Sequence, residues 1–308
     1  FLGVLWLTVV LGPKTVGHYT VVDHPSIKLT KVFIFAMMMT HVITDRKKLN
    51  GLFWVLAIAS LILGAKAWSL PMSYFYRGRL EGIGGADFAE ANFFAAFMAA
   101  MLPIIGILFI KSGWKGKLLC FFSGAFTANA VILCRSRGAF LGLAVGVMAA
   151  AFFAPKRHRK KIAVALVLGV LGGLYLTDDT FLERISTITL EQEEMDSSSQ
   201  SRLLLWGAGM KMLMDHPMGI GAGNWYQTIG RYIPEYEGKD SHNTYVKCAA
   251  ELGILGIAIY GFILINAYLQ LRRVRKLAEE LPKEKGDDLI QASFGLTVSL
   301  AIILTCGL

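Results

Sequence analysis

The feature that most constrains this chain is a succession of long apolar runs separated by short charged segments. A helix needs about 20 apolar residues to cross a bilayer, and backbone inside lipid must satisfy its own hydrogen bonds, so such runs predict spanning helices. A composition of 55% hydrophobic and 17% charged residues excludes an ordinary soluble domain of 308 residues. We predict an all-α, polytopic membrane protein with about eight spans and a further one at the end of the sequence, at residues 1–12, 29–43, 51–68, 91–110, 118–133, 138–154, 162–176, 245–269 and 289–308.

We expect one transmembrane domain over residues 1–308, truncated at both ends, because the sequence begins at Phe1 and stops inside an apolar run. Basic residues gather in the segments 46–48, 111–117, 156–161 and 272–276, which the positive-inside rule places in the cytoplasm. The net charge of +9 therefore sets topology and does not imply a nucleic-acid partner. The alternate segments then face outward, and the long outer loop at 177–243 is the largest of them.

The outer loop begins with an acidic, serine-rich stretch and continues into an amphipathic segment, 201–215, that predicts a helix on the membrane surface. Arg202 and Trp206 would share one face of this helix. The glycines at 219, 221 and 223 then predict a tight turn. A dinucleotide-binding loop is the alternative interpretation, but such a loop follows a strand and not an amphipathic helix.

Several arginines fall on the predicted outer side. Arg135 and Arg137 lie there against the positive-inside rule, in a short turn at the membrane boundary, and snorkelling is the alternative explanation. Arg77 and Arg79 lie in the outer segment 70–90, where a solvated loop is the alternative. Guanidinium groups bind phosphate in a bidentate manner, so with Arg202 these residues predict a site for a lipid-borne phosphate or diphosphate.

His242 and Asn243 come directly before the run 245–269, which places the imidazole at the membrane surface and not in lipid. Histidine can act as a base near neutral pH, and the alternative is a polar cap on a buried helix. We expect no metal and no cofactor: Asp178 and Asp179 are adjacent and not in D-x-D spacing, and the histidines show no ligand spacing. The four cysteines lack CxxC spacing, so neither a zinc site nor a disulfide framework is predicted.

Five short motifs follow one another along the chain: S-R-G-A-x-L at 136–141, S-R-x-x-x-W at 201–206, D-H-P-x-G-I-G-x-G-N at 215–224, H-N-T-Y at 242–245 and A-E-L-G-x-x-G at 250–256. Their order, over roughly residues 78–260, resembles the bacterial O-antigen ligase and polymerase superfamily, which includes protein O-oligosaccharyltransferases. The resemblance implies a glycan transferase at the outer face of the bacterial inner membrane, with undecaprenyl diphosphate carrying the donor glycan.

The resemblance also implies roles for three residues. Arg137 and Arg202 would contact the donor diphosphate, and His242 would be the catalytic base. Arg135, Arg77 and Arg79 are added to the substrate-binding set from charge placement, and Asn243 joins it beside His242. The expected partners are the lipid-linked glycan donor, a glycan, lipid or protein acceptor, and membrane lipids.

Several functions remain open on these motifs. An O-antigen ligase, a polysaccharide polymerase and a protein O-oligosaccharyltransferase share them and differ in the acceptor. A transporter for a lipid-linked glycan would place charged groups at mid-membrane and show repeated halves, whereas the runs 138–154 and 162–176 carry no charged side chain and no repeat is evident. A purely structural subunit would leave the outer arginines and His242 without a role.

Overall fold

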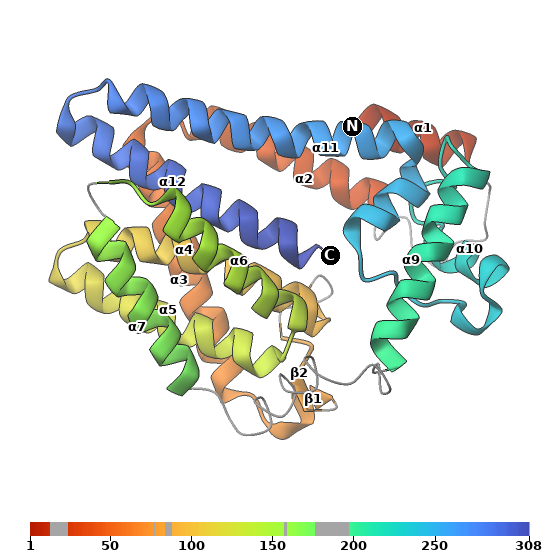
Figure 1. Ribbon diagram of the computed structural model, residues 1–308, viewed down its shortest axis with the longest axis horizontal. Helices are drawn as coiled ribbons and strands as arrows, with labels where there is room; N and C mark the ends of the chain where they lie inside the picture. The colour runs from red at the N-terminus through yellow and green to blue at the C-terminus, as the bar shows by residue number, and fades with distance from the viewer. Residues whose placement is uncertain (13–23, 77, 84–87, 157–158, 176–196, 308) are drawn as a thin grey trace. The chain divides into compact units, whose positions relative to one another are not determined.

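The computed structural model describes residues 1–12, 24–76, 78–83, 88–156, 159–175 and 197–307 (Figure 1). Within these ranges the regular secondary structure is helical apart from one two-stranded hairpin, which confirms the predicted all-α class. The chain divides into two compact units, each described here by itself. Unit 1 comprises residues 1–44, 190–266 and 307–308, and unit 2 comprises residues 45–189 and 267–306.

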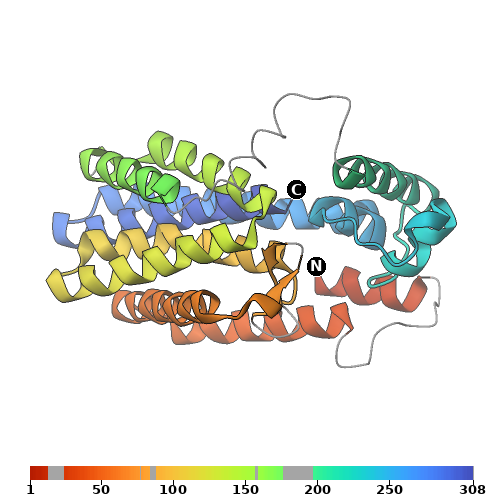
Figure 2. The same cartoon turned by 90° about the horizontal axis from the view of Figure 1, so that it is seen from below.

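Unit 2 is a helical bundle whose central element is α4, which packs against α3, α5, α6 and α12. Figure 2 shows these helices running alongside one another. The hairpin joins Phe75 to Leu80 and Tyr76 to Arg79 as antiparallel partners. The elements of unit 2 are α3 (Arg46–Ser69), η2 (Met72–Tyr74), β1 (Phe75–Tyr76), β2 (Arg79–Leu80), α4 (Ala91–Lys111), α5 (Trp114–Cys134), α6 (Arg137–Phe153), α7 (Arg159–Tyr175), the end of α11 (Thr244–Glu279) and α12 (Lys283–Cys306).

Small residues allow the helices of unit 2 to approach closely, as is common between membrane helices. A Cβ atom at Gly146 of α6 would lie 2.6 Å from Cγ1 of Ile302 in α12, and one at Gly64 of α3 would lie 2.7 Å from the backbone of Phe126 in α5. Buried hydroxyl groups add contacts between helices, since Ser299 donates a hydrogen bond of 2.7 Å to the carbonyl oxygen of Ala100. The bundle is therefore packed through small side chains and polar contacts rather than through large apolar ones alone.

Every predicted apolar run coincides with a helix of the structure. Five of the described helices are long and apolar enough to cross a membrane, namely α3, α4, α5, α11 and the part of α12 from Gly286 to Cys306. The helices α1 and α6, and the apolar part of α7 at Ile162–Gly172, are also apolar but are shorter, with 10–17 residues. The chain is thus a multi-pass membrane protein by helix length and composition.

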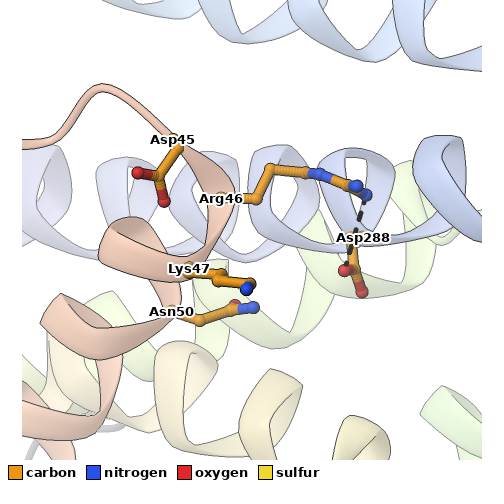
Figure 3. A pocket seen from close by; sticks show the side chains of 5 residues that line it. All are labelled: Asp45, Arg46, Lys47, Asn50 and Asp288. Carbon is orange, nitrogen blue, oxygen red and sulfur yellow. Dashed lines mark ion pairs between the residues drawn. The ribbon is translucent and has the colours of Figure 1, made fainter.

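Residues that were predicted to share the cytoplasmic side meet at one end of unit 2. The carboxylate of Asp288, near the start of α12, lies 3.9 Å from Arg46 at the start of α3 and 3.0 Å from Lys111 at the end of α4. Figure 3 shows the pocket that Asp288 and Arg46 line, together with Asp45, Lys47 and Asn50. Asp45 begins α3 by accepting a hydrogen bond of 2.9 Å from the amide of Lys48. These contacts join the start of α3, the end of α4 and the start of α12, and the cytoplasmic side of this end stays a prediction.

Unit 1 contains α1 (Leu2–Leu11), α2 (Pro25–Val42), α9 (Ser197–Asp215), α10 (Trp225–Tyr232), η4 (Pro234–Tyr236) and the first part of α11. The predicted helix in the outer loop is confirmed as α9. One face of α9, with Leu205 and Met212, is buried against Trp225 and Ile229 of α10. The face that carries Leu203 and Met210 is exposed, so it remains available for the predicted contact with the membrane surface.

Candidate functional site

The turn between α5 and α6 holds the arginines Arg135 and Arg137. Arg135 is the C-cap of α5 and has a left-handed backbone with φ 47°. Ser136 is the N-cap of α6, and its side chain accepts a hydrogen bond from the amide of Ala139. Arg137 is the first residue of α6, and its side chain is exposed. Both arginines are therefore fixed at the ends of helices and do not sit in a flexible loop.

A network of hydrogen bonds supports this turn from the hairpin and from α4. The Arg79 guanidinium donates to the carbonyl oxygen of Cys134 at 3.2 Å and to Oδ1 of Asn92 at 2.7 Å. The same Asn92 oxygen accepts a hydrogen bond of 2.9 Å from the hydroxyl group of Ser136. Arg79 is half-buried, and its hydrogen bonds join the hairpin to the last residue of α5 and to the start of α4. These contacts suit a residue that positions the turn.

The hairpin also approaches Arg135. A Cβ atom at Gly78 would lie 2.8 Å from Nη1 of Arg135, so the guanidinium of Arg135 rests against the hairpin where Gly78 has a φ of 72°. Arg77, the neighbour of Gly78 that was predicted to bind substrate, lies outside the described residues. The structure thus brings Arg79, Arg135 and Arg137 together at one end of unit 2.

His242 lies in unit 1 with an unusual backbone conformation. Its φ is 50°, a left-handed value that costs a non-glycine residue roughly 1–2 kcal/mol. Its neighbours Ser241 and Asn243 are 0% and 5% exposed, while the His242 side chain is exposed. Strain of this kind persists when the surrounding structure imposes it, and it is common at functional sites. The backbone therefore presents the imidazole outward from a buried support.

Hydrogen bonds on both sides of His242 account for this conformation. The Ser241 hydroxyl group donates to the carbonyl oxygen of Asn243 at 3.1 Å and accepts from the Asn243 amide at 3.3 Å. Oδ1 of Asn243 accepts from the amides of Tyr245 and Val246, both at 3.0 Å, so Asn243 caps the start of α11. Asn243 was predicted to bind substrate, and the structure shows its carboxamide oxygen bonded to the first turn of the helix.

Arg202 belongs to the same unit as His242, and α9 connects the two. The indole N–H of Trp206 donates a hydrogen bond of 3.0 Å to the carbonyl oxygen of Ser241, the residue before His242. Arg202 precedes Trp206 by one helical turn, so the two side chains share a face of α9. The pairing of Arg202 and His242 in one site stays a prediction. Arg137, the other arginine predicted to contact the diphosphate, belongs to unit 2.

The predicted glycine turn is confirmed, and it docks on a break in α11. Gly253 interrupts that helix with a φ of 69°. The amides of Ile220 and Gly221 donate to the carbonyl oxygens of Ala250 and Glu251 at 2.9 and 3.0 Å, and the amide of Ile254 donates to the carbonyl oxygen of Pro217 at 2.9 Å. Backbone groups that the break would leave unpaired are thereby satisfied by the turn.

Glu251 was not predicted as a site residue, although a carboxylate within an apolar run is a signal for a specific role. Its side chain is 7% exposed and accepts a hydrogen bond of 3.1 Å from the amide of Trp225, at the start of α10. The helix α10, which follows the glycine turn, was also missed by the sequence reasoning. Glu251 thus ties the beginning of α10 to α11.

Within the described ranges, no group of three or more histidine, cysteine, aspartate or glutamate side chains is placed to hold a metal ion. This observation leaves metal independence as a prediction. The predicted site residues that the structure describes offer guanidinium groups in both units and the exposed imidazole of His242 in unit 1.

Residues 122–261 match the family described as O-Antigen ligase. The matched segment contains Arg135, Arg137, Arg202, His242 and Glu251, whereas Arg79 and Asn92 precede it. No curated protein matches the chain. The family match confirms the resemblance that the order of the motifs predicted.

Proposed function

Because residues 122–261 match the O-antigen ligase family, we propose that this chain transfers a glycan from undecaprenyl diphosphate to an acceptor hydroxyl group. The family match supports a glycosyltransferase activity of the ligase or polymerase type. The donor, the acceptor and the mechanism are what we propose beyond it. The acceptor we propose is lipid A core. The observation that supports the proposal most directly is the exposed His242, which lies in a strained backbone between two buried neighbours inside the matched segment.

In the proposed reaction, His242 accepts the proton of the acceptor hydroxyl group while that oxygen attacks the anomeric carbon of the donor sugar. The bond from the anomeric carbon to the diphosphate breaks on the opposite face, so the configuration inverts and undecaprenyl diphosphate leaves. Arg137 and Arg202 stabilise the negative charge that grows on the departing diphosphate. This displacement needs no metal ion and no covalent glycosyl-enzyme.

We place this reaction at the outer face of the bacterial inner membrane, on the side opposite the basic segments. Single cysteines at Met72 and Trp114, which are 82% and 73% exposed, would test the placement in a variant without the native cysteines. A membrane-impermeant thiol reagent should label position 72 in intact cells and position 114 only after permeabilisation. Equal labelling at both positions would contradict the topology.

The function is tested with purified protein, a lipid-linked donor and lipid A core, in the presence of excess chelator. His242→Ala should lower kcat by roughly two to four orders of magnitude, and Arg137→Lys and Arg202→Lys should lower it because lysine loses the planar fork. His216→Gln and Arg231→Lys are matched controls at exposed positions and should keep full activity. A His242→Gln variant with more than about a tenth of the wild-type rate would rule out catalysis by this base.

The acceptor is decided in the same assay by offering a second lipid-linked repeat unit or an acceptor protein. Transfer only to a repeat unit would identify a polymerase, and transfer only to protein would identify an O-oligosaccharyltransferase. Movement of the donor across the bilayer without any new glycosidic bond would identify a transporter and overturn the proposal.

A further inference from the structure

The loop before His242 is tied down by a different part of unit 1 at each successive position. The indole N–H of Trp225 donates a hydrogen bond of 2.9 Å to the carbonyl oxygen of Lys239. Lys247 forms an ion pair with Asp240 at 3.0 Å. Trp206 bonds to the carbonyl oxygen of Ser241. His242 is the next residue along the chain, so its position depends on these contacts.

Among these residues, Lys247 contacts several groups at once. Its ammonium group lies 3.0 Å from Oδ1 of Asp240, 3.2 Å from the hydroxyl oxygen of Tyr226 and 4.3 Å from the centre of the Tyr226 ring. The Asp240 and Lys247 side chains are only 10% and 27% exposed. Lys247 stands one turn into α11, at the end where the helix dipole disfavours a cation. Its stabilisation therefore comes from the charges of Asp240 and Glu251 and from Tyr226.

The effect of this ion pair reaches His242 through one further hydrogen bond. Oδ1 of Asp240, which accepts from Lys247, also accepts a hydrogen bond of 2.9 Å from the amide of Ser241. Ser241 in turn exchanges hydrogen bonds with Asn243 across His242. A continuous series of contacts thus runs from α10 through α11 to both neighbours of His242.

We propose that Lys247 is a positioning residue for transfer, which through Asp240 holds His242 in the left-handed conformation that presents its imidazole to the acceptor. This inference rests on the proposed function of His242. Removal of the ammonium group leaves the Asp240 carboxylate nearly buried without its cation, so the loop must rearrange to hydrate it. The His242 backbone can then relax to an ordinary conformation, and the base moves away from the acceptor oxygen. A displacement of about 1 Å can cost roughly 100-fold in rate.

The experiment compares Lys247→Met in the wild-type and His242→Ala backgrounds, with purified protein, undecaprenyl-diphosphate-linked donor and lipid A core. In the wild-type background, Lys247→Met should lower kcat by roughly 10- to 100-fold, while KM for the donor changes less than about twofold. In the His242→Ala background it should cause no further loss, because it acts only through the missing base. Lys239→Met removes an exposed lysine from the same loop and should leave kcat unchanged.

Asp240→Asn is the second variant, and it keeps an oxygen for the Ser241 amide while it removes the charge that Lys247 needs. It should lower kcat, and the double variant with Lys247→Met should be no slower than Lys247→Met alone. The positioning role would be overturned if Lys247→Met lowered kcat by the same factor in the His242→Ala background as in the wild type. A raised KM for the donor or an unchanged kcat in the wild-type background would also overturn it. If His242→Ala itself retains full activity, the proposed function fails and not merely this inference.

Discussion

The indole N–H of Trp206 donates a hydrogen bond of 3.0 Å to the carbonyl oxygen of Ser241. Ser241 is fully buried, and His242 follows it with a φ of 50°. This contact anchors α9, with Arg202 one turn before Trp206, against the loop that presents the imidazole. Arg202, which we propose stabilises the leaving group, and His242, the proposed base, therefore lie on segments that this one hydrogen bond connects.

Replacement of Trp206 by phenylalanine tests this connection. The phenyl ring keeps most of the apolar surface but leaves the buried Ser241 carbonyl group without its donor, which should cost about 1–3 kcal/mol in the free energy of unfolding. We expect a lower melting temperature in detergent and a lower kcat for transfer. Trp114→Phe is the control, because Trp114 is 73% exposed. Unchanged stability and kcat in Trp206→Phe would show that the contact is dispensable.

The break in α11 predicts a large difference between two glycine substitutions in one helix. A Cβ atom at Gly253 would overlap the carbonyl oxygen of Pro217 and lie 2.5 Å from the carbonyl carbon of Met218, and the φ of 69° is unfavourable for alanine. Gly253→Ala should therefore destabilise the protein by at least about 2 kcal/mol. Gly261→Ala in the same helix meets nothing within 4 Å and should be neutral or stabilising. Thermal unfolding of both variants checks the difference, and equal melting temperatures would contradict the docking of the glycine turn on α11.

The apolar runs were sufficient to predict the long apolar helices, because their length and composition are local properties of the sequence, whereas the short helix α10 was missed. The glycine turn at 219–223 was also predictable, since these glycines have positive φ values that other residues adopt rarely. The break at Gly253 was not predicted, because Leu252 and Ile254 continue the apolar run on both sides of it. The backbone of residues 217–221, hydrogen-bonded to α11, stabilises the break.

Side-chain partners were harder to predict than elements. Arg79 was added to the substrate-binding set from its charge on the predicted outer side, but one of its acceptors is the carbonyl oxygen of Cys134, 55 residues further along the chain. Glu251 bonds to Trp225 across 26 residues, and no local pattern indicates that pair. Such contacts depend on tertiary packing, so the sequence indicated which residues carry chemistry but not which residues position them.

The N-cap of α3 gives a prediction for the dependence of stability on pH. The hydrogen bond from the Lys48 amide lowers the pKa of Asp45 below its ordinary value. A lowered pKa in the folded state means that Asp45 contributes stability above the unfolded pKa of about 3.9, and that this contribution is lost as pH falls through the folded value. Asp45→Asn retains a capping oxygen without the charge. Its melting temperature should be below that of wild type at pH 7, and the difference should disappear as the pH falls below the folded pKa of Asp45.

Asp45→Ala is the control for this measurement, because it removes the capping oxygen at every pH. Its melting temperature should stay below that of wild type over the whole range. A difference between wild type and Asp45→Asn that persists unchanged at low pH would mean that the carboxylate charge does not stabilise the start of α3.

Variants in the hydrogen-bond network around Asn92 test whether Arg79 positions the Arg135–Arg137 turn or binds the donor directly. If Arg79 positions the Arg135–Arg137 turn, Asn92→Ala removes the acceptor shared by Arg79 and Ser136 and should cost about 1–3 kcal/mol in stability together with a loss of kcat. Asn92→Asp keeps an acceptor at the same place and should retain both. Asn92→Ala and Ser136→Ala both remove the hydrogen bond between these two residues, so the double variant should lose less stability than the sum of the two single losses. If Arg79 instead binds the donor directly, Arg79→Lys should raise KM for the lipid-linked donor and leave the melting temperature unchanged. We expect the opposite pattern, a lower melting temperature and a lower kcat with little change in KM, because the guanidinium donates its hydrogen bonds to Cys134 and Asn92 of the protein itself.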